Sequence, residues 1–487
     1  MSLLNIPYPK TVWKYFDEIS RIPRLSKNES KIRKYLVVFA LSHNLEYKED
    51  EVGNILIIKP ASPGQENKKT IVLQSHMDMV GEKNSDHPHN WETDPIIPVI
   101  SDGWVHSPGT TLGADDGIGI AAQMAILADN SLEIGRIECL FTVDEESGMT
   151  GAINLKPDFI SGNILLNLDS EDEGILYIGC AGGMDTVGKI HYSTIIPDDE
   201  SCAYELSVTG LRGGHSGDEI HIGYGNSVKI MNSLLLLLTK KYEISINRFD
   251  AGNLRNAIPR EAFATITIKK KLAPNLEQTI KEYHLDIFRE LHKLEPDLKA
   301  DFHVVQMPDY IISPEDQRLL LLAIENCPHG VIGWSKDMKD LVETSTNLAS
   351  VKFTSDGMIT IVTTQRSSND QAKVEAAAMV EKILKTAKAD VKHSEGYPGW
   401  KPNLSSEILK ITRNSYLRLF GEEPKVRAIH AGLECGLIFE KNRNIDMISF
   451  GPSIQGAHTP EERLSIDSTK KFWDLLVDVI RNIPEKS

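Results

Sequence analysis

Short aliphatic runs alternate with longer amphipathic stretches through the first third of the chain. Runs with the length of buried strands lie at 54–61, 71–80, 136–148 and 163–172, and helical periodicity marks 9–20, 28–43 and 111–130. The stretch at 81–110 has neither period and predicts a loop. Because strands and helices alternate over 54–180, the pattern predicts a mostly parallel sheet with helices on both faces.

The pattern changes after the glycine-rich segment at 179–183. From about 186 to 398 it predicts a strand–helix–strand–strand–helix–strand series and then a second series that nearly repeats the first, with helices at 225–240, 275–294, 315–326 and 369–387. The earlier pattern resumes at 399 and closes with a helix at 466–482. The sequence therefore predicts one domain from 1–186 and 399–487 and an inserted α+β domain of two ferredoxin-like halves from 187–398.

Composition narrows the class of protein. The 487 residues are 41% hydrophobic and 25% charged, and the net charge of -16 argues against binding to nucleic acid or to an anionic membrane. The five cysteines are widely spaced, which favours a reducing compartment without a disulfide framework. The longest aliphatic run, Leu234 to Leu238, is too short to cross a membrane, and no secretory signal is evident, so we expect a cytoplasmic protein.

Metal-ligand side chains follow several of the predicted strands. They lie where strands of an open sheet deliver their ligands, and they are His76, Asp78, Asp115, Glu145, Glu146, Asp169 and His458. A lone His-x-Asp such as His76 and Asp78 is more often a core histidine with its partner. Several carboxylates together with two imidazoles favour a pair of divalent ions about 3.5–4 Å apart. Zn²⁺ is the first expectation, with Co²⁺ or Mn²⁺ as alternatives.

Five segments in this order resemble the M20 metallopeptidase family. They are HMDMV, GADDGIG, TVDEESGMTGA, NLDSEDEG and GPSIQGAHTPEE, and the insert adds GLRGGHSGDEIH at 210–221 and NLRNAIPREAFATI at 253–266. The resemblance covers nearly the whole chain. It implies an α/β fold in which a Zn-peptidase-like catalytic domain carries the inserted domain as a lid.

The resemblance also implies a role for each candidate ligand. Asp115 would bridge two ions and be joined to Asp116 by a cis peptide bond. His76 and Asp169 would complete the coordination of one ion, and Glu146 and His458 that of the other. Glu145 would be the general base, and Asp78 would orient His76.

Further residues are implied to contact the substrate. His215 would stabilise the oxyanion, and Arg366, with Asn256 as a second candidate, would bind the substrate carboxylate. Glu434 would meet the substrate ammonium. The alternatives are a surface-loop histidine, a solvated strand-end arginine, a turn asparagine and a helix-start carboxylate.

Three other features have simpler interpretations. Asp144 is expected to point away from the site, and His430 is interpreted as a loop or packing histidine. The pair Glu461 and Glu462 is expected to cap or solvate the turn after His458.

The resulting hypothesis is a di-metal hydrolase of unblocked dipeptides with broad specificity, including aminoacyl-histidine dipeptides such as carnosine. A deacylase of the same family that takes N-acyl amino acids is the first alternative, and a catalytically inactive metal-binding scaffold is the second. A homodimer stays open, because His215 would act either within its own chain or across a dimer.

Overall fold

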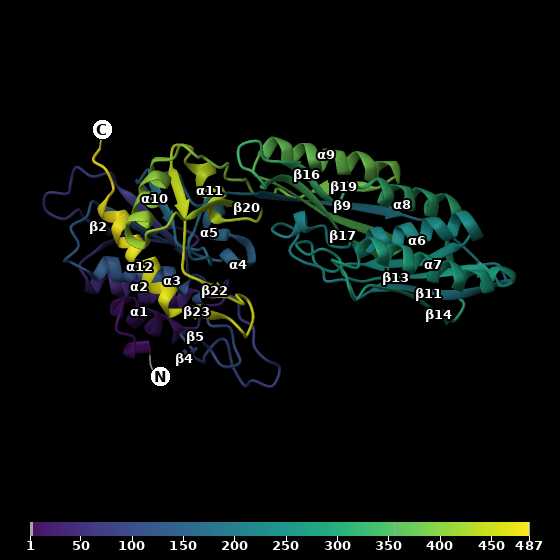
Figure 1. The fold of residues 1–487 in the computed structure, drawn as a ribbon, viewed down its shortest axis with the longest axis horizontal. Helices are drawn as coiled ribbons and strands as arrows, with labels where there is room; N and C mark the ends of the chain where they lie inside the picture. The colour runs from purple at the N-terminus through teal and green to yellow at the C-terminus, as the bar shows by residue number, and fades with distance from the viewer. Residues whose placement is uncertain (1–2, 355, 487) are drawn as a thin grey trace. The chain divides into compact units, whose positions relative to one another are not determined.

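The computed structural model describes residues 3–354 and 356–486 (Figure 1). It divides into two compact units. The first comprises the residues up to Cys180, Trp400–Ala428 and the residues from Leu433 on; the second comprises Ala181–Gly399 and Ile429–Gly432. The units thus divide at 180/181 and 399/400, whereas the sequence-based domain boundaries fall at 186/187 and 398/399.

The first unit is built on an eight-stranded sheet. In spatial order its strands are β1 (Glu46–Glu49), β2 (Ile55–Lys59), β6 (Ile137–Thr142), β3 (Ile71–His76), β7 (Ile164–Asn167), β21 (Asp446–Ser449), β8 (Ile175–Cys180) and β20 (Lys425–Ile429). A smaller four-stranded sheet has the order β22 (Ile454–Gln455), β23 (Arg463–Ser465), β5 (Trp104–His106) and β4 (Val99–Ser101).

The centre of the large sheet is parallel and fully buried. Strands β6, β3, β7 and β21 run parallel, and every residue of β3, β6 and β7 is buried. Such strands have continuous apolar sequences because both faces are covered. The prediction of a mostly parallel sheet holds only for this centre, because β1 and β2 form an antiparallel hairpin on one side and β8 pairs antiparallel with β21 on the other.

Eight α-helices accompany this sheet in the described part of the first unit. They are α1 (Lys10–Ser20), α2 (Ser30–Ser42), α3 (Ala114–Ala128), α4 (Glu145–Gly148), α5 (Thr150–Asn154), α10 (Glu407–Phe420), α11 (Glu434–Lys441) and α12 (Ile466–Arg481). Helix α3 connects the parallel strands β3 and β6 and packs against both α1 and β3. Its C-terminal carbonyl groups accept hydrogen bonds from the buried ammonium group of Lys59.

The second unit contains a nine-stranded antiparallel sheet. Its order is β14 (Lys299–Val305), β11 (Ser201–Thr209), β13 (Ala262–Lys269), β12 (Ser245–Ala251), β17 (Val342–Phe353), β18 (Met358–Ser367), β9 (Gly182–His191) and β19 (Asp390–His393), with β16 (Gly330–Trp334) paired to β17. A separate pair joins β10 (Thr194–Ile195) to β15 (Ile311–Ile312). Helices α6 (Ser227–Tyr242), α7 (Ala273–Leu291), α8 (Pro314–Asn326) and α9 (Asp370–Thr386) pack along this sheet (Figure 1).

Two sets of four strands share one arrangement in this sheet. One set is β11, β12, β13 and β14, and the other is β9, β17, β18 and β19. Numbered by sequence order within each set, the strands follow the spatial order 4-1-3-2. The first strand of the second set, β9, precedes the whole first set in the chain.

Several local predictions need correction. Strand β9 was not predicted, because it begins with two glycines and lacks alternation. The strand predicted over 136–148 ends at Thr142, since Glu145 already begins α4, and the one predicted over 163–172 ends at Asn167. The predicted loop at 81–110 contains the short strands β4 and β5.

Candidate metal centre

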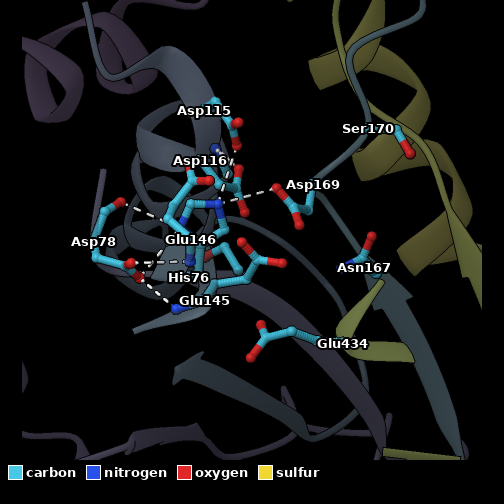
Figure 2. A network of polar contacts seen from close by, with 12 residues as sticks. His76, Asp78, Asp115, Asp116, Glu145, Glu146, Asn167, Asp169, Ser170 and Glu434 are labelled. Carbon is cyan, nitrogen blue, oxygen red and sulfur yellow. Dashed lines mark hydrogen bonds and ion pairs between the residues drawn. The ribbon is translucent and has the colours of Figure 1, made fainter. Parts of the chain in front are cut away.

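The candidate ligands come from the carboxyl ends of neighbouring parallel strands. His76 is the last residue of β3, Glu145 and Glu146 begin α4 just after β6, and Asp169 follows β7. Asp115 lies in the first turn of α3, which follows β3. Parallel strands bring such positions together at one edge of a sheet. Figure 2 shows these side chains converging on His76.

One group of ligand atoms surrounds the Nε2 atom of His76. This atom lies 3.0 Å from Oδ1 of Asp115 and 3.2 Å from Oδ1 of Asp169. The His76 side chain is 1% exposed, so the three groups meet away from bulk solvent.

A second group of ligand atoms surrounds the Nε2 atom of His458. This atom lies 3.2 Å from Oδ2 of Asp115 and 3.0 Å from Oε2 of Glu146. His458 lies between β22 and β23 and has a φ of 62°. The two carboxylate oxygens of Asp115 therefore face different imidazoles, one on each side.

Asp78 connects His76 to the start of α4. Its Oδ1 atom lies 3.5 Å from Nδ1 of His76, and its backbone carbonyl lies 3.2 Å from the same nitrogen. The same carboxylate accepts hydrogen bonds from the backbone N–H groups of Glu145 at 3.0 Å and of Glu146 at 3.2 Å. Asp78 thus orients the ring of one candidate ligand and holds the backbone of another.

The peptide bond between Asp115 and Asp116 is cis. The resemblance to the family implied this feature. Asp116 is buried, and its Oδ1 atom accepts a hydrogen bond from the backbone N–H of Gly119 at 3.1 Å.

Burial and close contacts shift the pKa values of several groups in the centre. Burial lowers the pKa of His76, but the carboxylates of Asp169 and Asp115 outweigh this effect and the pKa lies well above its ordinary value. Hydrogen bonds to Asp115 and Glu146 raise the pKa of His458 to about 11. Burial raises the pKa of Asp169 well above its usual range.

The donor set fits divalent cations. Among the described residues, three groups around this centre have ligand atoms that all lie within 4.8 Å of one another inside the group. The groups are His76 with Asp115 and Asp169, Asp115 with Glu146 and His458, and His76 with Glu145 and Glu146. Imidazole nitrogens with carboxylate oxygens are typical ligands of Zn²⁺, Mn²⁺ and Co²⁺. Asp115 belongs to two of these groups, which fits a carboxylate shared by two ions.

Glu434, the predicted ammonium ligand, lies in the same unit as the metal-ligand candidates (Figure 2). It is the first residue of α11 and fully buried. Its Oε2 atom accepts hydrogen bonds from Gln74 at 2.7 Å and Thr142 at 2.6 Å. Its Oε1 atom has no hydrogen-bond partner among the described residues, and burial raises the pKa of this carboxyl to about 7.

His215 belongs to the second unit and has a defined tautomer. The backbone N–H of Asp218 donates to Nδ1 of His215 at 3.1 Å, so the ring proton is on Nε2. Burial, with Arg366 nearby, lowers the pKa of His215 to about 4. The imidazole is therefore a neutral hydrogen-bond donor at physiological pH.

Arg366 and Asn256 also belong to the second unit. Arg366 is buried in β18, where its Nη1 donates to the hydroxyl of Tyr397 at 3.0 Å and its Nε has no partner in the described ranges. A buried guanidinium with donors left over is suited to an anion. Asn256 is exposed, and its backbone carbonyl accepts a hydrogen bond from Ser216, next to His215.

Two other predictions concern His430 and Asp144. His430 is a buried histidine whose Nε2 lies 2.8 Å from Oγ of Ser345, and burial lowers its pKa to about 3. Asp144 is bound by the hydroxyl groups of Ser147 and Thr150.

The expectation for Glu462 is wrong. Glu461 is exposed in the turn, but Glu462 is 2% exposed and accepts hydrogen bonds from four backbone N–H groups at the start of α3. Burial raises the pKa of Glu462, and the N–H groups of Gly113, Asp115 and Ala114 oppose that rise. Sequence reasoning also missed the buried Arg24, because its partners are backbone carbonyl groups that no pattern of side chains displays.

The fold and this centre define an α/β protein with a candidate carboxylate–imidazole metal site. The chain matches peptidase family M20/M25/M40 over residues 72–482. It is 39% identical over 486 residues to the cytosol non-specific dipeptidase of Escherichia coli K12, with 100% of both chains covered. The chain therefore belongs to the M20 peptidase family.

Solved structures give the same result. An aminoacylhistidine dipeptidase from Vibrio alginolyticus superposes with a TM-score of 0.90 at 39% identity, covering 100% of this chain and 99% of that one. The aminopeptidase PepT of Bacillus cereus shares the fold at a TM-score of 0.58 and 17% identity, over 97% of this chain and 98% of that one. None of the helices in the described ranges has the length and apolar character of a membrane-spanning helix.

Proposed function

We propose that this chain is a dinuclear metallodipeptidase that hydrolyses unblocked dipeptides in the cytosol, aminoacyl-histidine dipeptides among them. The full-length relatives at 39% identity carry the names cytosol non-specific dipeptidase and aminoacylhistidine dipeptidase. The single observation that carries the dinuclear part is the position of Asp115, whose two oxygens face His76 and His458 separately.

We assign His76 and Asp169 to one ion, Glu146 and His458 to the other, and Asp115 to both. When bound, two divalent cations supply Lewis acidity, which lowers the pKa of a water molecule and polarises the scissile carbonyl. Zinc is the first choice for this donor set, with cobalt or manganese as alternatives.

Glu145 acts as the general base in this proposal. Its carboxylate lies in the ligand group of His76 and Glu146, and its backbone is held by Asp78. It takes a proton from the attacking water and returns that proton to the leaving amine. Asp78 contributes by keeping the ring of His76 oriented and the start of α4 in place.

Groups of the second unit recognise the substrate. His215 presents a proton on Nε2 and is neutral, so it donates a hydrogen bond to the oxyanion without releasing a proton. Arg366 binds the substrate carboxylate through donors that include Nε, which has no hydrogen-bond partner among the described residues, with Asn256 beside the His215 loop as an additional contact. The second unit would then act as a lid, and the repeated strand arrangement supports its description as two ferredoxin-like halves.

Glu434 is assigned to the substrate ammonium group. Its unpartnered Oε1 atom supports this assignment, because a buried carboxylate oxygen without a donor is costly unless a cation or a donor reaches it. A ligand for the ammonium at one end and a guanidinium for the carboxylate at the other would favour short peptides with both termini free.

The test compares free and blocked substrates. The protein is reconstituted with Zn²⁺, Co²⁺ or Mn²⁺, and kcat/KM is measured for β-alanyl-histidine, alanyl-histidine and alanyl-alanine and for their N-acetyl forms. We expect turnover of the free dipeptides and at least a tenfold loss on acetylation. Preference for the acetylated forms would instead identify a deacylase, and bound metal without turnover of either set would identify an inactive scaffold.

A further inference from the structure

The start of α3 receives an unusual set of hydrogen bonds from a distant part of the chain. The N–H groups of Leu112 and Gly113 donate to Oε2 of Glu462 at 2.8 and 2.9 Å. Those of Ala114 and Asp115 donate to Oε1 at 2.7 and 3.3 Å. One buried carboxylate therefore accepts from four consecutive backbone N–H groups, the last of which belongs to the residue whose side chain faces both imidazoles.

The N–H groups that Glu462 binds belong to the backbone that leads into Asp115. A capping side chain accepts from N–H groups two or three residues later in the chain, as Asp116 does with the N–H of Gly119. Glu462 instead accepts from residues 112–115, so it fixes the backbone from which the Asp115 side chain extends. From that backbone the two oxygens of Asp115 reach His76 and His458.

The opposite side of the same loop is held by Arg24. This buried guanidinium donates to the carbonyl of Gly113, and to those of Met77 at 3.0 Å and Asp78 at 2.8 Å. Gly113 has a φ of +70°, and a Cβ atom there would lie 2.7 Å from Nη2 of Arg24. The loop is therefore bound through its N–H groups by an anion and through its carbonyl by a cation, which attract each other.

We propose that Glu462 is a positioning residue of the metal centre: by binding the N–H groups of residues 112–115, it fixes the backbone from which the carboxylate of Asp115 reaches both ions. This inference rests on the proposed function only for the presence of two ions, not for the reaction. It also gives the segment after β22 two tasks, since His458 contributes a ligand and Glu462, four residues later, orients a second one.

The experiment measures metal affinity without substrate. Wild type, Glu462→Gln and Glu462→Asp are stripped of metal and titrated with Zn²⁺ in competition with a chelating dye, and the unfolding temperature of each metal-free protein is recorded. Glu461→Gln is the matched control, because it removes the neighbouring carboxylate, which is exposed. Glutamine replaces one of the two accepting oxygens by an NH₂ group, which cannot accept from a backbone N–H. Aspartate keeps the negative charge and both oxygens, but its side chain is one methylene shorter.

We expect Glu462→Gln to weaken zinc binding by about 10- to 100-fold, Glu462→Asp to weaken it less, and Glu461→Gln to leave it unchanged. If Glu462→Gln does not fold, the comparison of Glu462→Asp with wild type decides, and an affinity within threefold of wild type overturns the proposal. A lower unfolding temperature of the metal-free variant with unchanged zinc affinity also overturns it, since the residue would then support only the fold. A wild type that binds two ions but hydrolyses no dipeptide would contradict the proposed function and leave this inference standing.

Discussion

Replacing Glu145 by glutamine separates two roles that the geometry allows. The carboxylate of Glu145 forms one group of possible ligand atoms with His76 and Glu146. It is therefore placed either to bind an ion or to accept a proton from water. The backbone N–H of Glu145 donates to Asp78 at 3.0 Å, and a change of the side chain leaves this hydrogen bond in place. Glutamine has the same shape and removes one negative charge that lies near the carboxylates of Glu146 and Glu434. The substitution therefore tests chemistry and not folding.

The expected magnitude follows from the loss of the proton acceptor. General base catalysis contributes about 10²–10⁴ in rate, which corresponds to about 2.7–5.5 kcal/mol of transition-state free energy. We expect kcat to fall by this factor in Glu145→Gln with KM nearly unchanged and with two ions still bound per chain. The measurements are steady-state kinetics on a free dipeptide and metal content by elemental analysis, with the exposed Glu133→Gln as a control.

Two results would refute the reasoning. If Glu145→Gln binds one ion instead of two, Glu145 is a ligand and the base must be sought elsewhere. If the variant binds both ions and keeps its rate, the proton is taken by another group.

Four further outcomes are expected. In His458→Ala one of the two ions should bind at least tenfold more weakly, because Asp115 and Glu146 lose their imidazole partner; equal affinity for both ions in a metal titration would contradict this. Arg366→Met should raise KM for a dipeptide by about 10- to 100-fold, the worth of a charge-assisted bond, and leave the dipeptide amide unaffected; an equal change for both would remove the arginine from the carboxylate site. Since the pKa of His215 is about 4, the ratio of kcat/KM between wild type and His215→Gln should be constant from pH 6 to 9, and a ratio that follows a titration near neutrality would contradict the neutral donor. The pKa of His430 is lowered to about 3 from its ordinary 6.5, so between these pH values the unfolded chain binds one proton more than the folded chain. As the pH falls from 6.5 toward 3, the free energy of unfolding of wild type should therefore decrease relative to that of His430→Gln, by up to about 1.4 kcal/mol per pH unit. Urea unfolding measures this difference.

The extent of sequence-based prediction differs between the parts of the centre. Strand polarity brings His76, Glu146 and Asp169 to one sheet edge, so a correct reading of β3, β6 and β7 is enough to expect them near one another. His458 follows no such rule, since it lies in a connection between two short strands. Its place after an apolar run made it a candidate, and the resemblance of its segment to the family assigned it to an ion. The distances place these side chains together, while their roles in catalysis are still predictions.

Contacts with backbone groups could not be predicted. Glu462 and Arg24 act on N–H and carbonyl groups that are present at every position, so the sequence contains no complementary partner to find. Strand β9 was missed for a similar reason, because it is identified by its pairing with β18 and β19 and not by its glycine-rich composition. The burial of Glu434 depends on how α11 packs, which a periodic pattern does not specify.

The separation of Asp115 and His458 by 343 positions has a consequence during synthesis. A ribosome that has completed the second unit has already released His76, Asp115 and Asp169, but not the imidazole that faces the other oxygen of Asp115. A growing or prematurely terminated chain would therefore lack His458, one of the five assigned ligands, and only Asp115 and Glu146 would be left to hold the second ion. Activity would begin only after the last part of the first unit has emerged and folded back.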